Sequence, residues 1–169
     1  MDELTIRQAE RADVDSIADA HRDSILSVGA TYYPAAAVAA WQEGIAGTLY
    51  LQAMARGEVF FIATGCVEGK PMVLGFSSDY PIEGSTHGTS VYVRGIAARR
   101  GIGTALLRQA ESHAIADGAA TIRISASLAG AHFYEVNGYR EVGRGEVQLL
   151  SGHPIECVFM QKSLAAAGC

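Results

Sequence analysis

The sequence predicts an α/β or α+β fold in which helices pack around one mixed β-sheet. Two hairpins and one strand–helix–strand unit carry this prediction, because hairpins are antiparallel and a strand–helix–strand connection joins parallel strands. The hairpins are rich in β-branched and aromatic residues around turn-like sequences, and the unit between them carries apolar residues at helical spacing. The three stretches are 58–65 with 71–80, 89–125, and 141–150 with 155–162.

Local patterns predict a short strand and three helices ahead of the first hairpin. The strand alternates apolar and polar residues, and the first helix follows Asp13, a residue type that caps helix N-termini. The second helix follows Pro34, which the first helical turn tolerates, and the third ends at Gly57. These elements are expected at 4–7, 13–25, 34–41 and 48–56.

The middle of the chain alternates between strands and helices. A loop-like stretch is followed by a strand, a long helix that ends at Gly118, another strand, and a short helix that ends at Gly138. These five elements are expected at 84–89, 89–94, 101–117, 121–125 and 129–137.

Length and composition indicate one globular domain spanning 1–169. Of the 169 residues, 49% are apolar and 18% are charged, and no repeat or low-complexity linker divides the chain. The net charge of -5, from 13 basic and 18 acidic residues, argues against nucleic acid or an anionic membrane as partner. The sequence has neither a signal peptide nor an apolar stretch of membrane-spanning length, so we expect a cytoplasmic protein.

The three cysteines suggest neither a metal site nor a disulfide framework. The spacing of Cys66, Cys157 and Cys169 fits neither arrangement. Cys157 falls on a predicted strand and is interpreted as a small buried apolar residue. We therefore expect no bound metal and a reducing environment.

The clearest chemical feature is a basic, glycine-bearing turn between a strand and a helix. Residues 91–107 read VYVRGIAARRGIGTALL, so the helix begins at the turn. A helix N-terminus offers unpaired N–H groups and the positive end of the helix dipole. Gly101 and Gly103 lack the Cβ atoms that would hold a phosphate away, and Arg99 and Arg100 can add charge-assisted hydrogen bonds. The turn is therefore predicted to cradle a pyrophosphate.

The turn has three alternative interpretations: an ordinary helix start, a Walker A loop and a dinucleotide-binding fingerprint. An ordinary glycine helix start with two solvated arginines would have the same composition. The turn is not a Walker A loop, because no Lys-Ser/Thr pair follows the last glycine. It is not the dinucleotide-binding fingerprint either, because Leu106 stands where the third glycine would be.

The turn resembles the acetyl-coenzyme A signature of the GNAT superfamily, Q/R-x-x-G-x-G/A after a strand ending in YV. Gly101 and Gly103 match the signature, whereas Ala98 replaces its leading Gln or Arg, and 94–96 replace the usual HPD or HPE. A second stretch, 125–143, reads SASLAGAHFYEVNGYREVG and resembles the family's C-terminal motif FYEKLGF. Both motifs occur in the family's order, which favours the functional interpretation over two unrelated coincidences.

The resemblance implies a GNAT fold, with a central, mostly antiparallel sheet, two splayed parallel strands, and flanking helices. The pantetheine arm of acetyl-CoA is then expected between the strands around 91–93 and 122–125. Ser127 is the expected substitute for an asparagine that this sequence lacks. The cofactor-binding residues that the resemblance implies are Val91, Tyr92, Val93, Arg99, Arg100, Gly101, Ile102, Gly103, Thr104, Ser127 and Tyr134.

By the same resemblance, the activity is transfer of an acetyl group from acetyl-CoA to an amine, by direct attack in a ternary complex. A small-molecule amine is the first expected acceptor. A protein N-terminus, a lysine, or a catalytically weak acyl-CoA-binding domain are the alternatives. Small members of this family are often dimers, so a homodimer is the expected assembly.

Tyr134 is expected to face the thioester sulfur and to act as general acid, because a phenol with a pKa of about 10 is protonated at neutral pH. The alternative is that Tyr134 is a core aromatic residue. For the base, His87 at the start of the cofactor-binding strand is the first candidate and Glu83 the weaker one, with a chain of water molecules as the alternative.

Three aromatic residues fall in the helical region that lies beside the acceptor groove in the family. Tyr32, Tyr33 and Trp41 are therefore the candidate substrate-binding residues. For Trp41, the alternative interpretation is a core anchor for its helix.

Overall fold

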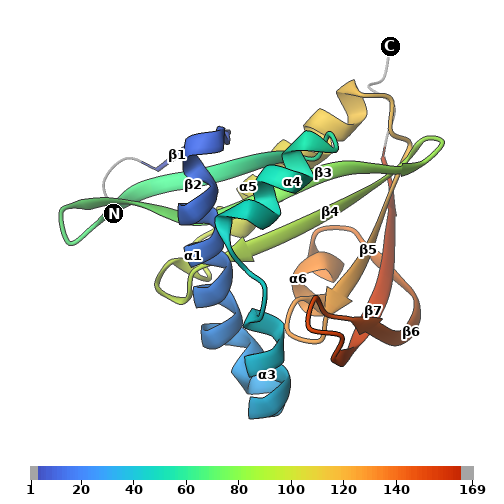
Figure 1. The fold of residues 1–169 in the computed structure, drawn as a ribbon. Helices are drawn as coiled ribbons and strands as arrows, with labels where there is room; N and C mark the ends of the chain where they lie inside the picture. The colour runs from blue at the N-terminus through green and yellow to red at the C-terminus, as the bar shows by residue number, and fades with distance from the viewer. Residues whose placement is uncertain (1–3, 165–169) are drawn as a thin grey trace.

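The structure is a computed structural model that describes residues 4–164, so the prediction for Cys169 lies outside the described residues. Within this part of the chain, seven strands form one sheet in the order β1-β2-β3-β4-β5-β7-β6 (Figure 1). Each neighbouring pair is antiparallel except β4 and β5, which confirms the predicted mixed sheet. The strands are β1 (Thr5–Gln8), β2 (Val59–Val67), β3 (Lys70–Glu83), β4 (Thr86–Val93), β5 (Thr121–Ser127), β6 (Arg140–Gln148) and β7 (Pro154–Ser163).

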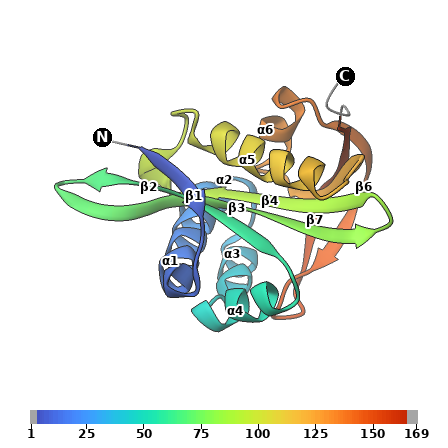
Figure 2. The ribbon, with the colours of Figure 1, turned by 90° about the horizontal axis from the view of Figure 1, so that it is seen from above.

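Helices cover both faces of the sheet, with α1, α3 and α4 on one face and α5 and α6 on the other (Figure 2). The first helix is longer than the predicted 13–25, because a π-helix at Ile25–Gly29 and the single turn α2 continue it. No helix in the described part of the chain is both long and apolar enough to cross a membrane. The helices are α1 (Val14–Ser24), α2 (Ala30–Tyr32), α3 (Ala35–Gln42), α4 (Gly47–Ala55), α5 (Ile102–Ala116) and α6 (Ala131–Val136).

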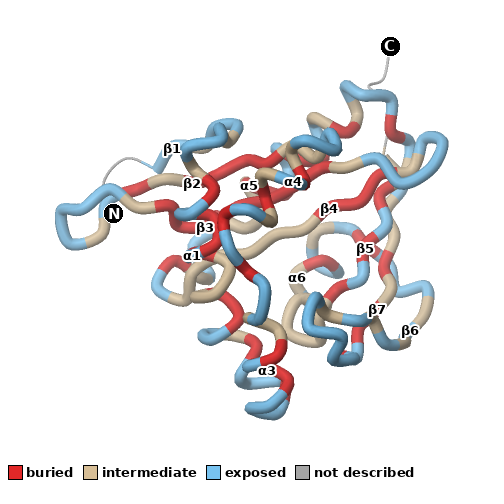
Figure 3. The backbone as a smooth tube through the Cα atoms, in the orientation of Figure 1, coloured by how far each residue is buried: buried red, intermediate tan, exposed pale blue. Residues whose placement is uncertain are grey.

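The core consists of two apolar layers, one on each face of the sheet. On β2, Phe60 and Ile62 pack into the layer beneath α1 and α4, whereas Phe61 and Ala63 pack into the layer beneath α5. This alternation follows from the two-residue period of a strand. The middle parts of β2 and β3 are buried, whereas no residue of the edge strand β6 is (Figure 3).

The only parallel contact in the sheet, among the residues that the structure describes, is short. β4 pairs with β5 at three positions, and the last of them joins Gly88 to Arg123. Beyond this point β4 continues to pair with β3, and β5 continues to pair with β7. The two strands therefore separate over the rest of their length, which confirms the predicted splay.

The predicted loop at 84–89 is wrong. β3 extends to Glu83 and β4 begins at Thr86, so most of this stretch is strand. Tyr80 pairs with Gly88 across the hairpin, and a Cβ atom added to Gly88 would lie 2.3 Å from Cζ of the Tyr80 ring. Gly88 therefore marks a place where the Tyr80 ring lies close to the backbone of the neighbouring strand. A glycine at this position does not indicate a loop.

Candidate functional site

The separation of β4 from β5 opens a cleft of about 490 Å³, here called the β4–β5 cleft. β4 lines it with residues 89–93 and β5 with residues 124–127. On β4, Val91 and Val93 pack against the apolar clusters beneath α5, whereas Tyr92 packs against the cluster beneath α1. The cleft thus has an α5 side and an α1 side, and it connects the two faces of the sheet.

The predicted phosphate turn lies on the α5 side of the cleft. Arg99 and Gly101 both have positive φ angles, of 60° and 78°, and α5 begins at the next residue after Gly101. Arg99, Gly101, Gly103 and Thr104 line the cleft. The first turn of α5 therefore presents its N–H groups to the cleft, with one guanidinium beside them.

The two positions of the turn that are glycine require a glycine for different structural reasons. A Cβ atom at Gly101 would meet no other atom within 4 Å, so space does not require a glycine there. The positive φ angle does, because glycine adopts it without steric cost. At Gly103, a Cβ atom would lie 3.1 Å from the ring of Phe133, so this glycine allows α5 to approach α6 closely. Only the second reason involves a residue far away in the sequence.

Two residues of the predicted phosphate turn do not line the cleft. Ile102 is 2% exposed and belongs to the apolar core beneath α5, so only its backbone N–H can serve a ligand there. Arg100 is exposed and lies outside the cleft lining. Arg99 is therefore the arginine that the structure brings to the cleft.

Tyr134 lines the cleft on the α5 side. Its side chain comes from α6 and is 4% exposed, with the rings of Phe133 and Tyr139 packed edge-on against it. Burial raises the pKa of the Tyr134 phenol above its usual value, and a hydrogen bond with the Val91 backbone offsets only part of this rise. The phenol is therefore protonated at neutral pH and able to donate.

Ser127 also lines the cleft, at the end of β5. Its hydroxyl accepts a hydrogen bond of 3.1 Å from the Gly130 amide, which fixes the turn leading into α6. Its direct role in the structure is therefore to position the segment that carries Tyr134.

His87, the first candidate for the general base, does not line the cleft. It is 3% exposed, and its Nδ1 lies 2.7 Å from Asp79 Oδ1. The other oxygen of Asp79 lies 2.6 Å from Nδ1 of His113 on α5, and Nε2 of His87 lies 3.7 Å from Asp117 Oδ2. The reason is the register, since His87 precedes the point where β4 leaves β5.

We call Asp79, His87, His113 and Asp117 the histidine–aspartate cluster. Asp79 and His113 are not among the site residues that the sequence predicted. The sequence signal that could have united them is the register of the hairpin, which places Asp79 opposite Thr89, beside the strand position of His87. In the described part of the chain, no group of three or more His, Cys, Asp or Glu side chains is arranged to hold a metal ion.

The three candidate substrate-binding aromatics have three different environments. Tyr32 is 53% exposed and lies outside the cleft lining. Tyr33 is buried, and its hydroxyl donates to the Glu156 carbonyl at 2.7 Å and accepts from the Leu128 amide at 2.8 Å. Trp41 lines the α1 side of the cleft and packs edge-on against the Tyr33 ring, so it is both a packing residue and a cleft residue.

Sequence analysis missed most of the α1 side. Ser24, Ile25 and Val28 line it from the end of α1 and the π-helix, and Tyr80 and Ser90 line it from the sheet. Their approach depends on long-range packing. A glycine such as Gly88, placed opposite Tyr80 in the hairpin, is the sequence signal that could have indicated the Tyr80 ring on this side of the cleft.

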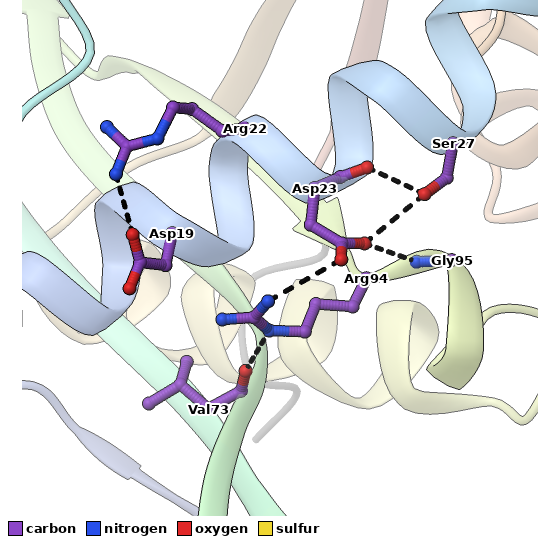
Figure 4. Close-up of polar contacts among 7 residues, drawn as sticks. All are labelled: Asp19, Arg22, Asp23, Ser27, Val73, Arg94 and Gly95. Atoms are coloured by element: carbon purple, nitrogen blue, oxygen red, sulfur yellow. Dashed lines mark hydrogen bonds and ion pairs between the residues drawn. The ribbon is translucent and has the colours of Figure 1, made fainter.

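A polar network fastens the end of α1 to the segment after β4 (Figure 4). Asp23 Oδ1 accepts a hydrogen bond of 2.9 Å from the Gly95 amide, and Asp23 Oδ2 lies 3.5 Å from Arg94 Nη1. Arg94 Nε in turn donates to the Val73 carbonyl at 2.7 Å. A Cβ atom at Gly95 would lie 2.5 Å from Ser27 Oγ, so the contact is close. The residues that replace the family's usual HPD or HPE thus hold the α1 side in place.

Comparison with known proteins decides the family. The model of the GNAT acetyltransferase domain matches residues 55–141. The chain belongs to the GNAT acetyltransferase family. It is therefore an acetyl-CoA-dependent N-acetyltransferase, and the predictions of family, enzyme class and cosubstrate are confirmed. No curated protein sequence matches the chain significantly.

Solved structures support the same assignment. A GCN5-related N-acetyltransferase from Rhodopseudomonas palustris is 27% identical with a TM-score of 0.79, covering 97% of this chain and 98% of that one. PaiA N-acetyltransferase from Thermoplasma acidophilum, in complex with coenzyme A, is 18% identical with a TM-score of 0.74, covering 96% and 99%. YncA from Salmonella typhimurium, a putative acetyltransferase with acetyl-CoA, is 19% identical with a TM-score of 0.70, covering 99% and 97%. The last two show the shared fold.

Proposed function

We propose that this GNAT enzyme transfers the acetyl group of acetyl-CoA to a small-molecule amine, by direct attack in a ternary complex within the β4–β5 cleft. The observation that carries the proposal is that one cleft connects both faces of the sheet. The phosphate turn and Tyr134 line its α5 side, and a separate set of side chains lines its α1 side. A donor and an acceptor can therefore meet between the splayed strands.

The α5 side fits acetyl-CoA. The first turn of α5 and the Arg99 guanidinium suit the pyrophosphate. Beyond Gly88, the edge of β4 that faces β5 has no strand partner, so its backbone groups near Val91 and Val93 are available to the amides of the pantetheine arm. Coenzyme A structures of the PaiA and YncA neighbours support this placement by analogy of fold.

When bound, acetyl-CoA supplies a thioester whose carbonyl carbon accepts the amine nitrogen. The new C–N bond forms, the C–S bond breaks, and the sulfur leaves with the electron pair. In this proposal Tyr134, which lines the cleft, gives its phenolic proton to that sulfur, and a backbone N–H near Val93 polarises the carbonyl. Because His87 lies outside the cleft, water is the proposed acceptor of the proton that the amine loses.

The first test is binding of acetyl-CoA followed by turnover. A ligand at 100 times its Kd stabilises the native state by about 2.7 kcal/mol, which for a domain of this size raises Tm by roughly 5–10 °C. Absence of any rise at millimolar acetyl-CoA would contradict the proposal. Release of the CoA thiol with an amine panel then reports turnover, and clear binding without turnover would favour an acyl-CoA-binding domain.

The second test concerns Tyr134. Tyr134→Phe is expected to lower kcat by about 100-fold, because a general acid contributes on the order of 100- to 10,000-fold, while the rise of Tm with acetyl-CoA persists. Tyr139→Phe is the matched control, since Tyr139 is also buried on this face but lies outside the cleft lining. Equal kcat in Tyr134→Phe and wild type would remove the general-acid role.

A further inference from the structure

The two sides of the cleft differ in charge. Among the described residues that line the cleft, Arg99 alone carries a formal charge, and it belongs to the phosphate turn on the α5 side. The α1 side combines apolar walls with hydroxyl groups. Its lining residues are Ser24, Ile25, Val28, Gly29, Trp41, Tyr80, Ser90 and Tyr92.

Three ionisable side chains on or behind the α1 side of the cleft, His21, Tyr80 and Tyr92, are uncharged at neutral pH. Burial lowers the pKa of His21 to about 3, and the ring of His21 lies against Tyr92 with 3.9 Å between centroids. Burial raises the pKa of Tyr92 to about 12 and also raises that of Tyr80. At neutral pH the imidazole is therefore uncharged and both phenols are protonated.

The nearby acidic residues are occupied elsewhere. Asp23, at the end of α1, binds the Gly95 amide and lies beside Arg94. Glu58 interacts through its carboxyl group with the Ser78 hydroxyl, and Ser78 Oγ lies 2.8 Å from Ser90 Oγ. Of these groups only Ser90 lines the cleft, and among the described lining residues there is no carboxylate that could meet an ammonium group.

A charged substituent on the acceptor would therefore have no counter-ion. Removing an unpaired ammonium or carboxylate from water costs several kcal/mol, whereas apolar surface gains about 25 cal/mol for each Å² buried. The flat ring of Trp41, held edge-on against Tyr33, adds a surface on which an aromatic ring can pack.

We propose that the acceptor is a primary monoamine carried on an apolar aryl or alkyl body, without a second charge. This inference rests on the proposed function and names its substrate class. Ser24, Ser90 and the two phenols supply hydrogen bonds, and the amine nitrogen enters as the uncharged free base that attack on a thioester requires. Polyamines, aminoglycosides and free amino acids are excluded by the same argument.

The test uses matched pairs of amines that differ by one charge, with kcat/KM measured through release of the CoA thiol. Hexylamine is compared with 1,6-diaminohexane, and phenylalaninamide with phenylalanine. We expect kcat/KM to be at least about tenfold higher for hexylamine and for phenylalaninamide than for their more highly charged partners. A tenfold ratio corresponds to about 1.4 kcal/mol. Equal or better turnover of the charged members would overturn the inference.

A substitution on the wall sharpens the test. Val28→Asp places a carboxylate on the α1 side and is expected to raise kcat/KM for 1,6-diaminohexane relative to hexylamine by about tenfold. Val28→Asn is the control of equal size without the charge. If the two variants give the same ratio, the lack of charge on the wall does not select the acceptor, and the inference fails.

Failure of the inference is distinguishable from failure of the proposed function. If acetyl-CoA neither raises Tm nor is consumed with any amine, the proposed function fails first. If acetyl-CoA binds and the enzyme prefers polyamines, amino acids or a peptide N-terminus over every apolar monoamine, the function as an acetyltransferase stands and the acceptor class is wrong. A peptide with an alanine N-terminus is the probe for that last outcome.

Discussion

The two halves of β4 have opposite chemistry. Over Thr86–Gly88 the strand pairs with β5, and the buried His87 there is hydrogen-bonded within the histidine–aspartate cluster. Over 89–93 it leaves β5, and the cleft that opens there has one charged lining residue among those the structure describes, Arg99. Carboxylate and imidazole groups thus meet where the strands are held together, whereas the described residues that line the cleft include neither kind of group.

This difference has a physical reason. A buried charge is tolerated when it is paired and hydrogen-bonded, as Asp79 is between His87 and His113. We call Thr86–Gly88 the closed half of β4 and residues 89–93 the open half. The closed half is expected to contribute stability, and the open half is expected to contribute binding and selectivity.

The largest expected effect comes from the closed half. Asp79→Ala removes a carboxylate that is 3% exposed and leaves two imidazoles without their partner, so we expect a loss of about 3 kcal/mol in the free energy of unfolding. Denaturant unfolding measures it. The matched control is Asp117→Ala, whose side chain is 63% exposed and which should cost less than about 0.5 kcal/mol.

The comparison weakens if the Asp79→Ala variant stays within 1 kcal/mol of wild type. It would also weaken if the folded variant lost the rise of Tm with acetyl-CoA, because the histidine–aspartate cluster lies outside the cleft lining.

The next effect is a pH dependence from His21, behind the open half. The pKa of His21 is about 3 in the folded protein and about 6.5 in an unfolded chain, so the unfolded chain binds more protons between these values. The contribution to stability is complete above pH 6.5 and is lost as the pH falls. At pH 5 the loss amounts to about 2 kcal/mol.

His21→Gln keeps a neutral partner for Tyr50 and removes the titration, so its unfolding free energy should fall less between pH 7 and pH 5 than that of wild type. His132→Gln is the control, because the His132 side chain is 86% exposed. Parallel pH profiles for wild type and His21→Gln would show that His21 is not held neutral.

The smallest effect concerns the single charge of the cleft lining. Arg99→Ala is expected to raise the Kd of acetyl-CoA about tenfold, through loss of a charge-assisted hydrogen bond of roughly 1.5 kcal/mol. Arg100→Ala, outside the lining and exposed, should raise it less than about threefold. Isothermal titration at two salt concentrations measures both, and a larger effect of Arg100→Ala would reverse their assignment.

The local parts of the site were predictable from sequence. A glycine-bearing basic turn before a helix predicts a helix N-terminus at this point of the chain, because a helix start depends on neighbouring residues. The resemblance to the family's C-terminal motif implied that Tyr134 faces the cosubstrate, and its side chain lines the cleft.

The parts that depend on register were not predictable. His87 was expected in a loop near the thioester, and the contact between Gly88 and Tyr80 made it a buried strand residue instead. The packing of Gly103 against Phe133 and the pairing of Asp79 with His113 join residues that are about 30 positions apart. Such contacts follow from how elements pack and leave little trace in any one segment.

The hydroxyl of Tyr33 has a mechanical consequence. It binds the Leu128 amide at the end of β5 and the Glu156 carbonyl on β7, while its ring supports Trp41. The cleft wall that carries Trp41 is therefore tied to the end of β5 and to β7 through a single oxygen atom.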